Sequence, residues 1–122
     1  MTKGAALQQF FSSFGISAYP TEDVPKDAAF PWLTYETITG AWGDSVGITV
    51  NLWYYSERNV EINAKAQELS AAIGLGGKII PCDGGAIWIK RGSPWCQSIR
   101  DEADDKIKRR YINITLEYLT QV

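Results

Sequence analysis

The stretch Phe30-Pro31-Trp32-Leu33-Thr34-Tyr35-Glu36-Thr37-Ile38 decides the fold, because it marks where an ordered strand begins. Pro31 has a fixed φ and no N–H, so it fits the first position of a strand but not a central one. After it, successive side chains alternate between two faces, which is the pattern of a half-buried strand. One face takes Trp32, Thr34, Glu36 and Ile38, and the other takes Leu33, Tyr35 and Thr37.

The same alternation occurs twice more along the chain. Residues 48–55 place Ile48, Val50, Leu52 and Tyr54 on one face and Thr49, Asn51, Trp53 and Tyr55 on the other. The second face is half polar and half aromatic, so we do not expect it to face water throughout, and Trp53 and Tyr55 are candidate contact residues. A last strand is predicted to begin near Lys106 and to run to the end of the chain, with an apolar face of Ile112, Ile114, Leu116 and Tyr118.

Two helices are predicted from apolar residues at helical spacing. The first carries Leu7, Phe10, Phe11 and Phe14 on one stripe, and Gly15 is expected to end it. The second carries Ile62, Ala66, Leu69 and Ile73, and ends at Gly74. Ser56 or Asn59 is suited to cap its start. Each helix has one apolar face, so both are able to cover the same sheet.

The remaining segments are predicted to be short strands and loops. A strand is expected at Ile16 to Tyr19 and a hairpin at Lys78 to Pro81 and Ala86 to Lys90. Gly40 to Gly47 is expected to be a long hairpin connection, whereas Pro20 to Ala29 and Ser93 to Asp105 are irregular. Hairpin connections favour antiparallel pairing. The pattern therefore predicts an α+β fold, a mainly antiparallel sheet with two helices packed on one face, in a single domain of residues 1–122.

Composition sets further bounds. A chain of 122 residues that is 45% hydrophobic and 21% charged is expected to form one core. Its net charge of -2 argues against a protein that mainly grips a phosphate backbone. Without a secretory signal or an apolar run near the roughly 20 residues of a membrane span, we expect a cytoplasmic chain with no membrane partner. Cys82 and Cys96 are expected to be reduced thiols, with a disulfide between them as the alternative.

No pattern indicates catalysis, so we predict no catalytic, cofactor-binding or metal-binding residue. The chain lacks histidine, the commonest general base near neutral pH. Gly74 to Lys78 differs from a phosphate-binding loop because it follows a helix and Ile79 replaces the Ser or Thr that would meet magnesium. The acidic residues Asp101, Glu102, Asp104 and Asp105 lack the glycine and the spacing of a calcium loop. A solvated acidic loop is the simpler interpretation.

Basic and aromatic residues are interpreted as protein contacts. Lys106, Lys108 and Arg110 alternate with Ile107 and Arg109, which is expected to disperse the positive charge over two faces instead of forming a groove. Without a basic groove, the five tryptophans and six tyrosines are expected in the core and in protein interfaces. The candidate interface residues are Trp42, Asp44, Trp53, Tyr55, Trp95, Arg109 and Arg110.

Five features follow one another along most of the chain. They are the opening helix, the stretch from Val24-Pro25 to Tyr35, the Ile48 to Tyr55 strand, the Asn59 to Ile73 helix, and the closing strand Arg109-Arg110-Tyr111-Ile112-Asn113-Ile114-Thr115-Leu116. In this order they resemble the small tail-terminator or tail-completion proteins of long-tailed bacteriophages. The loops at Ala41 to Val46 and Pro94 to Asp105 take no part in the resemblance.

The resemblance implies a structural protein of the virion tail or neck, and not an enzyme. Such a protein would form a hexameric ring that caps the tail tube, ends tail elongation and provides the head-tail joining surface. Its partners would be further copies of itself, the tail tube protein and the head-tail connector protein, with a monomer allowed for the free chain. DNA would pass through the ring without specific binding. The acidic loop from Asp101 to Asp105 is then expected to line the lumen and repel the DNA phosphates.

Three alternatives stay open. Within the same class, another neck, head-completion or minor tail protein of similar size would show a similar pattern. A metal-dependent enzyme using the carboxylates of Asp101 to Asp105 would require an ordered metal in a concave pocket. A nucleic-acid-binding module would show an affinity that falls steeply with salt concentration.

Overall fold

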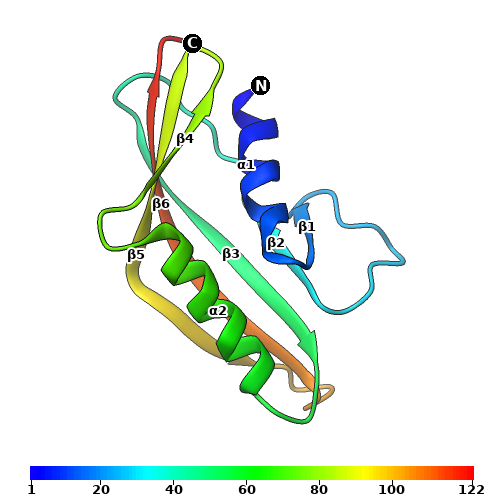
Figure 1. The fold of residues 1–122 in the computed structure, drawn as a ribbon. Coiled ribbons are helices and arrows are strands. Elements are labelled where there is room, and N and C mark those ends of the chain that lie inside the picture. Colours follow the sequence, from blue (N-terminus) through cyan, green and yellow to red (C-terminus); the bar gives the residue numbers. More distant parts are fainter.

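The computed structural model describes residues 1–122 as a six-stranded sheet with two helices (Figure 1). The helices are α1 (Lys3–Phe11), which continues into the 3₁₀ turn η1 (Ser12–Phe14), and α2 (Val60–Ile73). The strands are β1 (Ser17–Pro20), β2 (Trp32–Tyr35), β3 (Ser45–Tyr55), β4 (Lys78–Cys82), β5 (Gly85–Arg100) and β6 (Ile107–Thr120). Neither helix is long and apolar enough to cross a membrane.

The strands lie in the order β1-β2-β3-β6-β5-β4. Only β1 and β2 pair in parallel, and every other neighbouring pair is antiparallel. β1 is an edge strand and has only one neighbour. Pro20 at its end has no N–H, but no second strand lies there to accept a hydrogen bond. The long strands β3, β5 and β6 form the centre of the sheet. The predicted α+β class with a mainly antiparallel sheet is confirmed.

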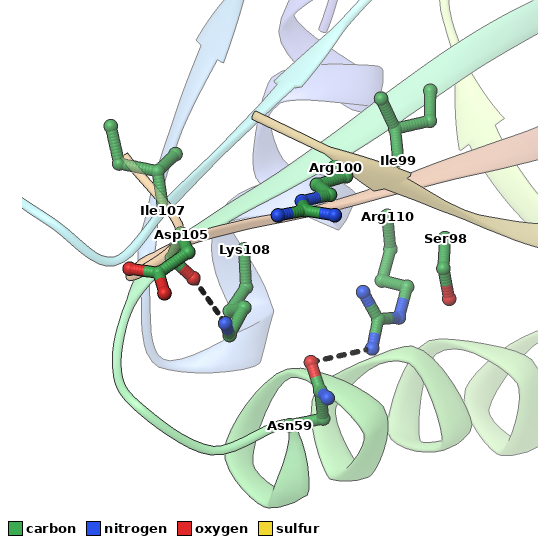
Figure 2. A pocket seen from close by; sticks show the side chains of 8 residues that line it. All are labelled: Asn59, Ser98, Ile99, Arg100, Asp105, Ile107, Lys108 and Arg110. Carbon is green, nitrogen blue, oxygen red and sulfur yellow. Dashed lines mark hydrogen bonds between the residues drawn. The ribbon is translucent and has the colours of Figure 1, made fainter. Parts of the chain in front are cut away.

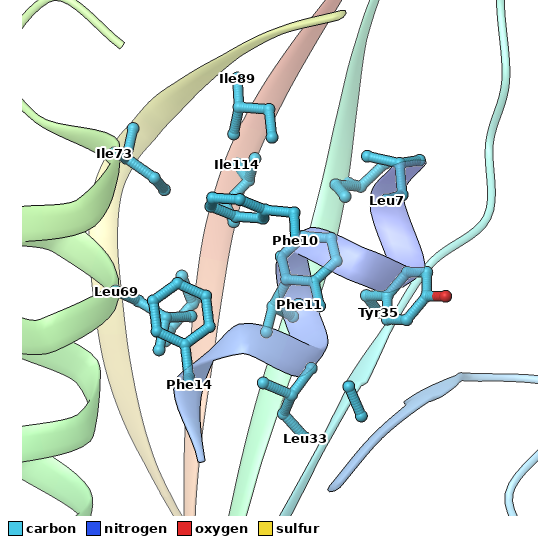
Figure 3. Close-up of a cluster of buried hydrophobic side chains, with 14 of the residues drawn as sticks. Leu7, Phe10, Phe11, Phe14, Leu33, Tyr35, Leu69, Ile73, Ile89 and Ile114 are labelled. Atoms are coloured by element: carbon cyan, nitrogen blue, oxygen red, sulfur yellow. The ribbon is translucent and has the colours of Figure 1, made fainter. Parts of the chain in front are cut away.

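Both helices pack on one face of the sheet and enclose the core with it. Figure 3 shows α1 and α2 directing apolar side chains toward the sheet and toward each other. The ring of Phe11 stacks on that of Tyr35 with centroids 4.7 Å apart, so the strand that follows Pro31 lies under α1. Leu33 and Leu69 are fully buried in the same cluster. The opposite face of the sheet carries no helix, and we call it the open face.

The predicted helix ends are confirmed, with one change at the start of α2. Gly15, at φ 81°, follows η1, and Gly74, at φ 79°, follows α2. Positive φ is easily reached by glycine, so both residues can end a helix. Asn59 is the N-cap residue of α2, but its side chain makes no capping hydrogen bond. Ser56 instead accepts a hydrogen bond from the backbone N–H of Arg58.

The prediction of an irregular segment from Ser93 to Asp105 is wrong over its first half. β5 continues to Arg100, and its pairing with β6 shifts register between Arg91 and Cys96. The extra residues of a bulge disturb the alternation of side chains, so the period-two pattern is lost although the strand continues. The amide of Asn113 on β6 donates to the carbonyl oxygen of Pro94 at 2.8 Å and ties the bulge to its neighbour.

Both chain ends lie near the turn between β4 and β5 (Figure 1). The terminal ammonium of Met1 lies 2.6 Å from a carboxylate oxygen of Asp83 in that turn. The ammonium of Lys3 donates to the carbonyl oxygens of Gly40 and Val122. Cys82 and Cys96 are both free thiols, as expected, and burial raises the pKa of each.

Candidate functional site

The open face of the sheet carries a group of aromatic side chains at one end. Strand register places Trp32 of β2, Trp53 of β3 and Arg109 of β6 in one row across the sheet. Phe30 precedes β2 and Tyr55 ends β3, and their rings lie beside this row. We call Phe30, Trp32, Trp53 and Tyr55 the aromatic patch.

The rings of the aromatic patch contact one another and remain partly open to solvent. Phe30 lies 4.4 Å from Trp32 and 5.7 Å from Tyr55 between ring centroids, and Trp32 stacks on Trp53 at 6.0 Å. Phe30 is 38% exposed and Tyr55 53% exposed. Contacting aromatic rings that keep this much exposure leave apolar surface for a partner to bury.

Arg109 and two buried polar residues hold the patch in place. The guanidinium of Arg109 lies 4.8 Å from the ring centroid of Trp53, and its Nε donates to Oδ1 of Asn51 at 2.8 Å. The indole N–H of Trp53 donates to the hydroxyl of Thr34 at 3.4 Å. Asn51 and Thr34 are both buried although they lie on the open face, because the patch covers them. The surface is therefore a packed layer and not a set of free side chains.

The structure brings together only three of the seven predicted interface residues, Trp53, Tyr55 and Arg109. Trp42 is 70% exposed in the segment between β2 and β3, away from the patch. Asp44 stabilises that segment, because its carboxylate accepts the N–H of Ala41 at 2.8 Å. Trp95 lies in the bulge of β5 and packs against the core.

Arg110 differs most from its predicted role. It faces α2, is only 6% exposed, and hydrogen-bonds Asn59 and Asn63 of that helix region. Sequence reasoning also missed Phe30 and Trp32 as members of the patch. The alternation after Pro31 put Trp32 on the same face as Thr34, but only the pairing of β2 with β3 places it beside Trp53.

The acidic residues Asp101, Glu102, Asp104 and Asp105 form the connection between β5 and β6. A carboxylate oxygen of Asp101 accepts the N–H groups of Ala103 at 2.8 Å and Asp104 at 3.1 Å. That of Asp104 accepts the N–H of Lys106 at 2.9 Å. These carboxylates stabilise the turn, and nowhere in the chain do three or more potential metal ligands gather. The loop is acidic, as the sequence predicted, with Glu102 and Asp105 exposed and Asp101 and Asp104 half-buried.

Beside this loop lies a cleft with a volume of about 300 Å³, between the ends of β5 and β6 and the start of α2 (Figure 2). We call it the basic cleft. Its lining includes Arg100, Lys108, Arg110, Asp105, Asn59 and Ser98. The expectation that alternation disperses the positive charge is therefore wrong for Lys108 and Arg110, because β5 continues as a strand and adds Arg100 directly opposite Lys108.

Comparisons with known proteins gave no relatives. No protein-family model matches the chain, and neither the curated proteins nor the solved structures include a match. The aromatic patch, the acidic loop and the basic cleft are therefore the features on which a functional proposal can rest.

Proposed function

We propose that the chain is a structural subunit of a bacteriophage tail, of the tail-terminator or tail-completion type. In this role it assembles into a ring that caps the tail tube, stops tail elongation and offers a joining surface to the head. The observation that carries the proposal is the aromatic patch with Arg109 on the open face of the sheet. The order of the sequence features resembles that of this family, and the proposal that the assembly is a phage tail rests on this resemblance.

The composition of the patch favours a protein partner. Tryptophan, tyrosine, phenylalanine and arginine are enriched at protein interfaces, where they supply most of the binding energy. Exposed Tyr55 and Phe30 provide the accessible apolar surface, and Arg109 provides a guanidinium at its border. The partner in this proposal is a second copy of the chain or the tail tube protein. Trp42, on a separate segment, offers a second contact point for a ring neighbour.

The acidic loop suits a position at the lumen of such a ring. It carries four carboxylates in five residues between β5 and β6, and the side chains of Glu102 and Asp105 are exposed. A surface of negative charge repels the phosphates of DNA and lets the duplex pass without being held. The loop lies at the same end of the sheet as the patch, because Tyr55 is paired with Ile107, which directly follows the loop.

The test is to measure the mass of the chain alone and after incubation with assembled tail tubes. We expect a defined oligomer on the tubes, and a halt in tube growth when the chain is present during polymerisation. Replacing Tyr55 with serine is expected to weaken this assembly by removing an exposed ring from the patch. The matched control is Leu75→Ser, because Leu75 is 96% exposed in the turn after α2 and lies outside the patch.

Several outcomes would contradict the proposal. One is that the chain never associates with tubes. Another is that the Tyr55→Ser and Leu75→Ser variants assemble equally well. Binding to the head connector without any effect on tube growth would indicate a head-completion protein instead. A salt-sensitive gel shift with DNA in the absence of assembly would indicate a nucleic-acid-binding module.

A further inference from the structure

Three cationic side chains line the basic cleft without any ion-pair partner. Arg100 and Lys108 are directly opposite each other in the pairing of β5 with β6, and Arg110 is the next residue on the same face of β6. None of the three lies within 4.0 Å of a carboxylate oxygen. Like charges directly opposite each other destabilise a sheet. An anion held between them would remove this repulsion.

Arg110 is the most unusual of the three, because it is buried among neutral partners. Its Nε and Nη2 donate to Oδ1 of Asn63 at 3.1 and 2.9 Å, its Nη2 also donates to Oδ1 of Asn59 at 3.1 Å, and its Nη1 donates to the carbonyl oxygen of Arg109 at 3.1 Å. These bonds use four of the five guanidinium N–H groups. One N–H of Nη1 is left without a protein acceptor. The group is held rigidly while its charge stays uncompensated.

The rest of the lining leaves a net positive charge. Lys108 donates to the backbone carbonyl oxygen of Asp105, which does not neutralise its ammonium (Figure 2). The carboxylate of Asp105 is the one acidic group in the lining. Three cations and one carboxylate give the lining a net charge of +2. Asn59 and the hydroxyl of Ser98 add polar groups to its wall.

We propose that the basic cleft binds a tetrahedral phosphate group with two negative charges, either free inorganic phosphate or the terminal phosphate of a nucleotide. The charge of such a group, about −1.5 to −2 near neutral pH, matches that of the cleft. Guanidinium groups pair well with phosphate oxygens through parallel N–H donors. A single carboxylate would leave one positive charge uncompensated. The site lies on the helix-covered face and does not depend on the proposed ring.

The test is thermal unfolding of the intact chain in sodium phosphate and in sodium chloride of equal ionic strength at pH 7.5. At a phosphate concentration ten times the dissociation constant, we expect the unfolding midpoint to rise by about 5 °C over the chloride value. Isothermal titration with inorganic phosphate is expected to give one site per chain.

A double variant tests whether the rise in the unfolding midpoint with phosphate arises in the basic cleft. Arg100→Gln with Lys108→Gln removes two of the three cations but keeps Arg110 and its bonds to α2, so the variant is expected to fold and to lose most of the phosphate shift. The control is Lys26→Gln with Lys78→Gln, which makes the same change in net charge on two exposed lysines outside the cleft. This control is expected to keep the full shift.

Comparison of different ligands distinguishes free inorganic phosphate from the terminal phosphate of a nucleotide. Equal stabilisation by inorganic phosphate and a nucleoside monophosphate supports a site for the phosphate alone, and stronger stabilisation by the nucleotide supports a nucleotide terminus. Equal stabilisation by acetate would overturn the proposal in favour of a partner carboxylate. The proposal would also be overturned if phosphate caused no specific rise in the unfolding midpoint, or if both double variants showed the same rise. A response to duplex DNA without one to phosphate would overturn it as well.

Discussion

Adjacent arginines on β6 take different roles because strand alternation turns them to opposite faces. Arg109 lies on the open face, over the ring of Trp53. Arg110 lies under α2, where amide oxygens of Asn59 and Asn63 bind its guanidinium. The sequence predicted the alternation but treated both residues as parts of one interface. Only the positions of α2 and β3 distinguish a surface arginine that supports an aromatic layer from a buried arginine that lines a cleft.

Replacing Arg109 with lysine is expected to lower the free energy of unfolding by about 1 kcal/mol, because a compact ammonium cannot both cover the ring of Trp53 and donate to Asn51 as the guanidinium does. Urea unfolding monitored by tryptophan fluorescence measures the change. Arg58→Lys is the control, since Arg58 is exposed and pairs only with Glu61, and it should change stability by less than about 0.5 kcal/mol. Equal effects of the two substitutions would argue against a structural role for the guanidinium of Arg109.

Tyr118 makes the stability of the chain depend on pH in the alkaline range. Its side chain is fully buried, and its hydroxyl donates to the carbonyl oxygen of Ile38 at 2.8 Å. Burial raises the pKa of Tyr118 to about 12 from an ordinary value of 10.0, with a smaller contribution from Cys82. Between these values the unfolded chain has lost the phenolic proton while the folded chain retains it. The free energy of unfolding therefore falls as pH rises from about 10 to about 12.

Tyr118→Phe tests this dependence by removing the titrating group. The variant is expected to be less stable at pH 8 by about 1 kcal/mol, because the hydrogen bond to Ile38 is lost. From pH 10 to 12 its stability should fall less steeply than that of the wild type, so that the two curves converge. Parallel curves across this range, measured by urea unfolding at each pH, would exclude Tyr118 as the source.

At the scale of elements, regular patterns were predictable and interrupted ones were not. The helical stripe of α2 and the alternation of β3 identified both elements, because each buries one face along its whole length. β5 was recognised only as far as Lys90, because the bulge between Arg91 and Cys96 shifts its side chains out of phase. The lost half of β5 carries Arg100, which explains why the basic cleft could not be foreseen.

The turn between α2 and β4 depends on a glycine in a left-handed conformation. Gly77 has φ 84°, and a Cβ atom there would lie 2.5 Å from Nε1 of Trp88 and 2.6 Å from the carbonyl oxygen of Ile89. Gly77→Ala is therefore expected to cost about 2 kcal/mol or more in the free energy of unfolding. Gly76→Ala should change it by less than about 1 kcal/mol, because its Cβ would meet no atom within 4 Å. Similar urea midpoints for the two variants would contradict this account of the turn.

At the scale of the whole molecule, the two faces of the sheet differ in how completely they are buried. Helices α1 and α2 bury one face and stabilise the fold, while the other face is closed only in part by the aromatic patch. In a two-layer fold of this kind, no further layer of helices or strands covers the other sheet face. The acidic loop and the patch lie at the same end of the sheet, so an assembly through the patch would hold the loop in a defined position.

Neutralising Glu102 and Asp105 together, as Glu102→Gln and Asp105→Asn, tests the proposed lumen. Neither carboxylate accepts a hydrogen bond, so we expect the chain to fold and assemble on tubes as before. Infectivity of phage carrying the variant is expected to fall, because a less negative lumen holds passing DNA more strongly. Asp23→Asn with Asp27→Asn is the control with the same charge change in the exposed loop before β2. Equal infectivity of the two variants would refute a lumenal position.

The sequence by itself determined the class of the fold and most of its elements. The spacing of apolar residues along a helix or strand shows directly which of its side chains are buried. It also located the acidic loop, and it singled out Trp53, Tyr55 and Arg109, which the structure brings together on the open face. Only the tertiary structure decided which residues from different strands meet. Cross-strand register joins Trp32 to Trp53 and Arg100 to Lys108, and helix packing buries Arg110. Such contacts depend on pairings far apart in the chain, which no local pattern encodes.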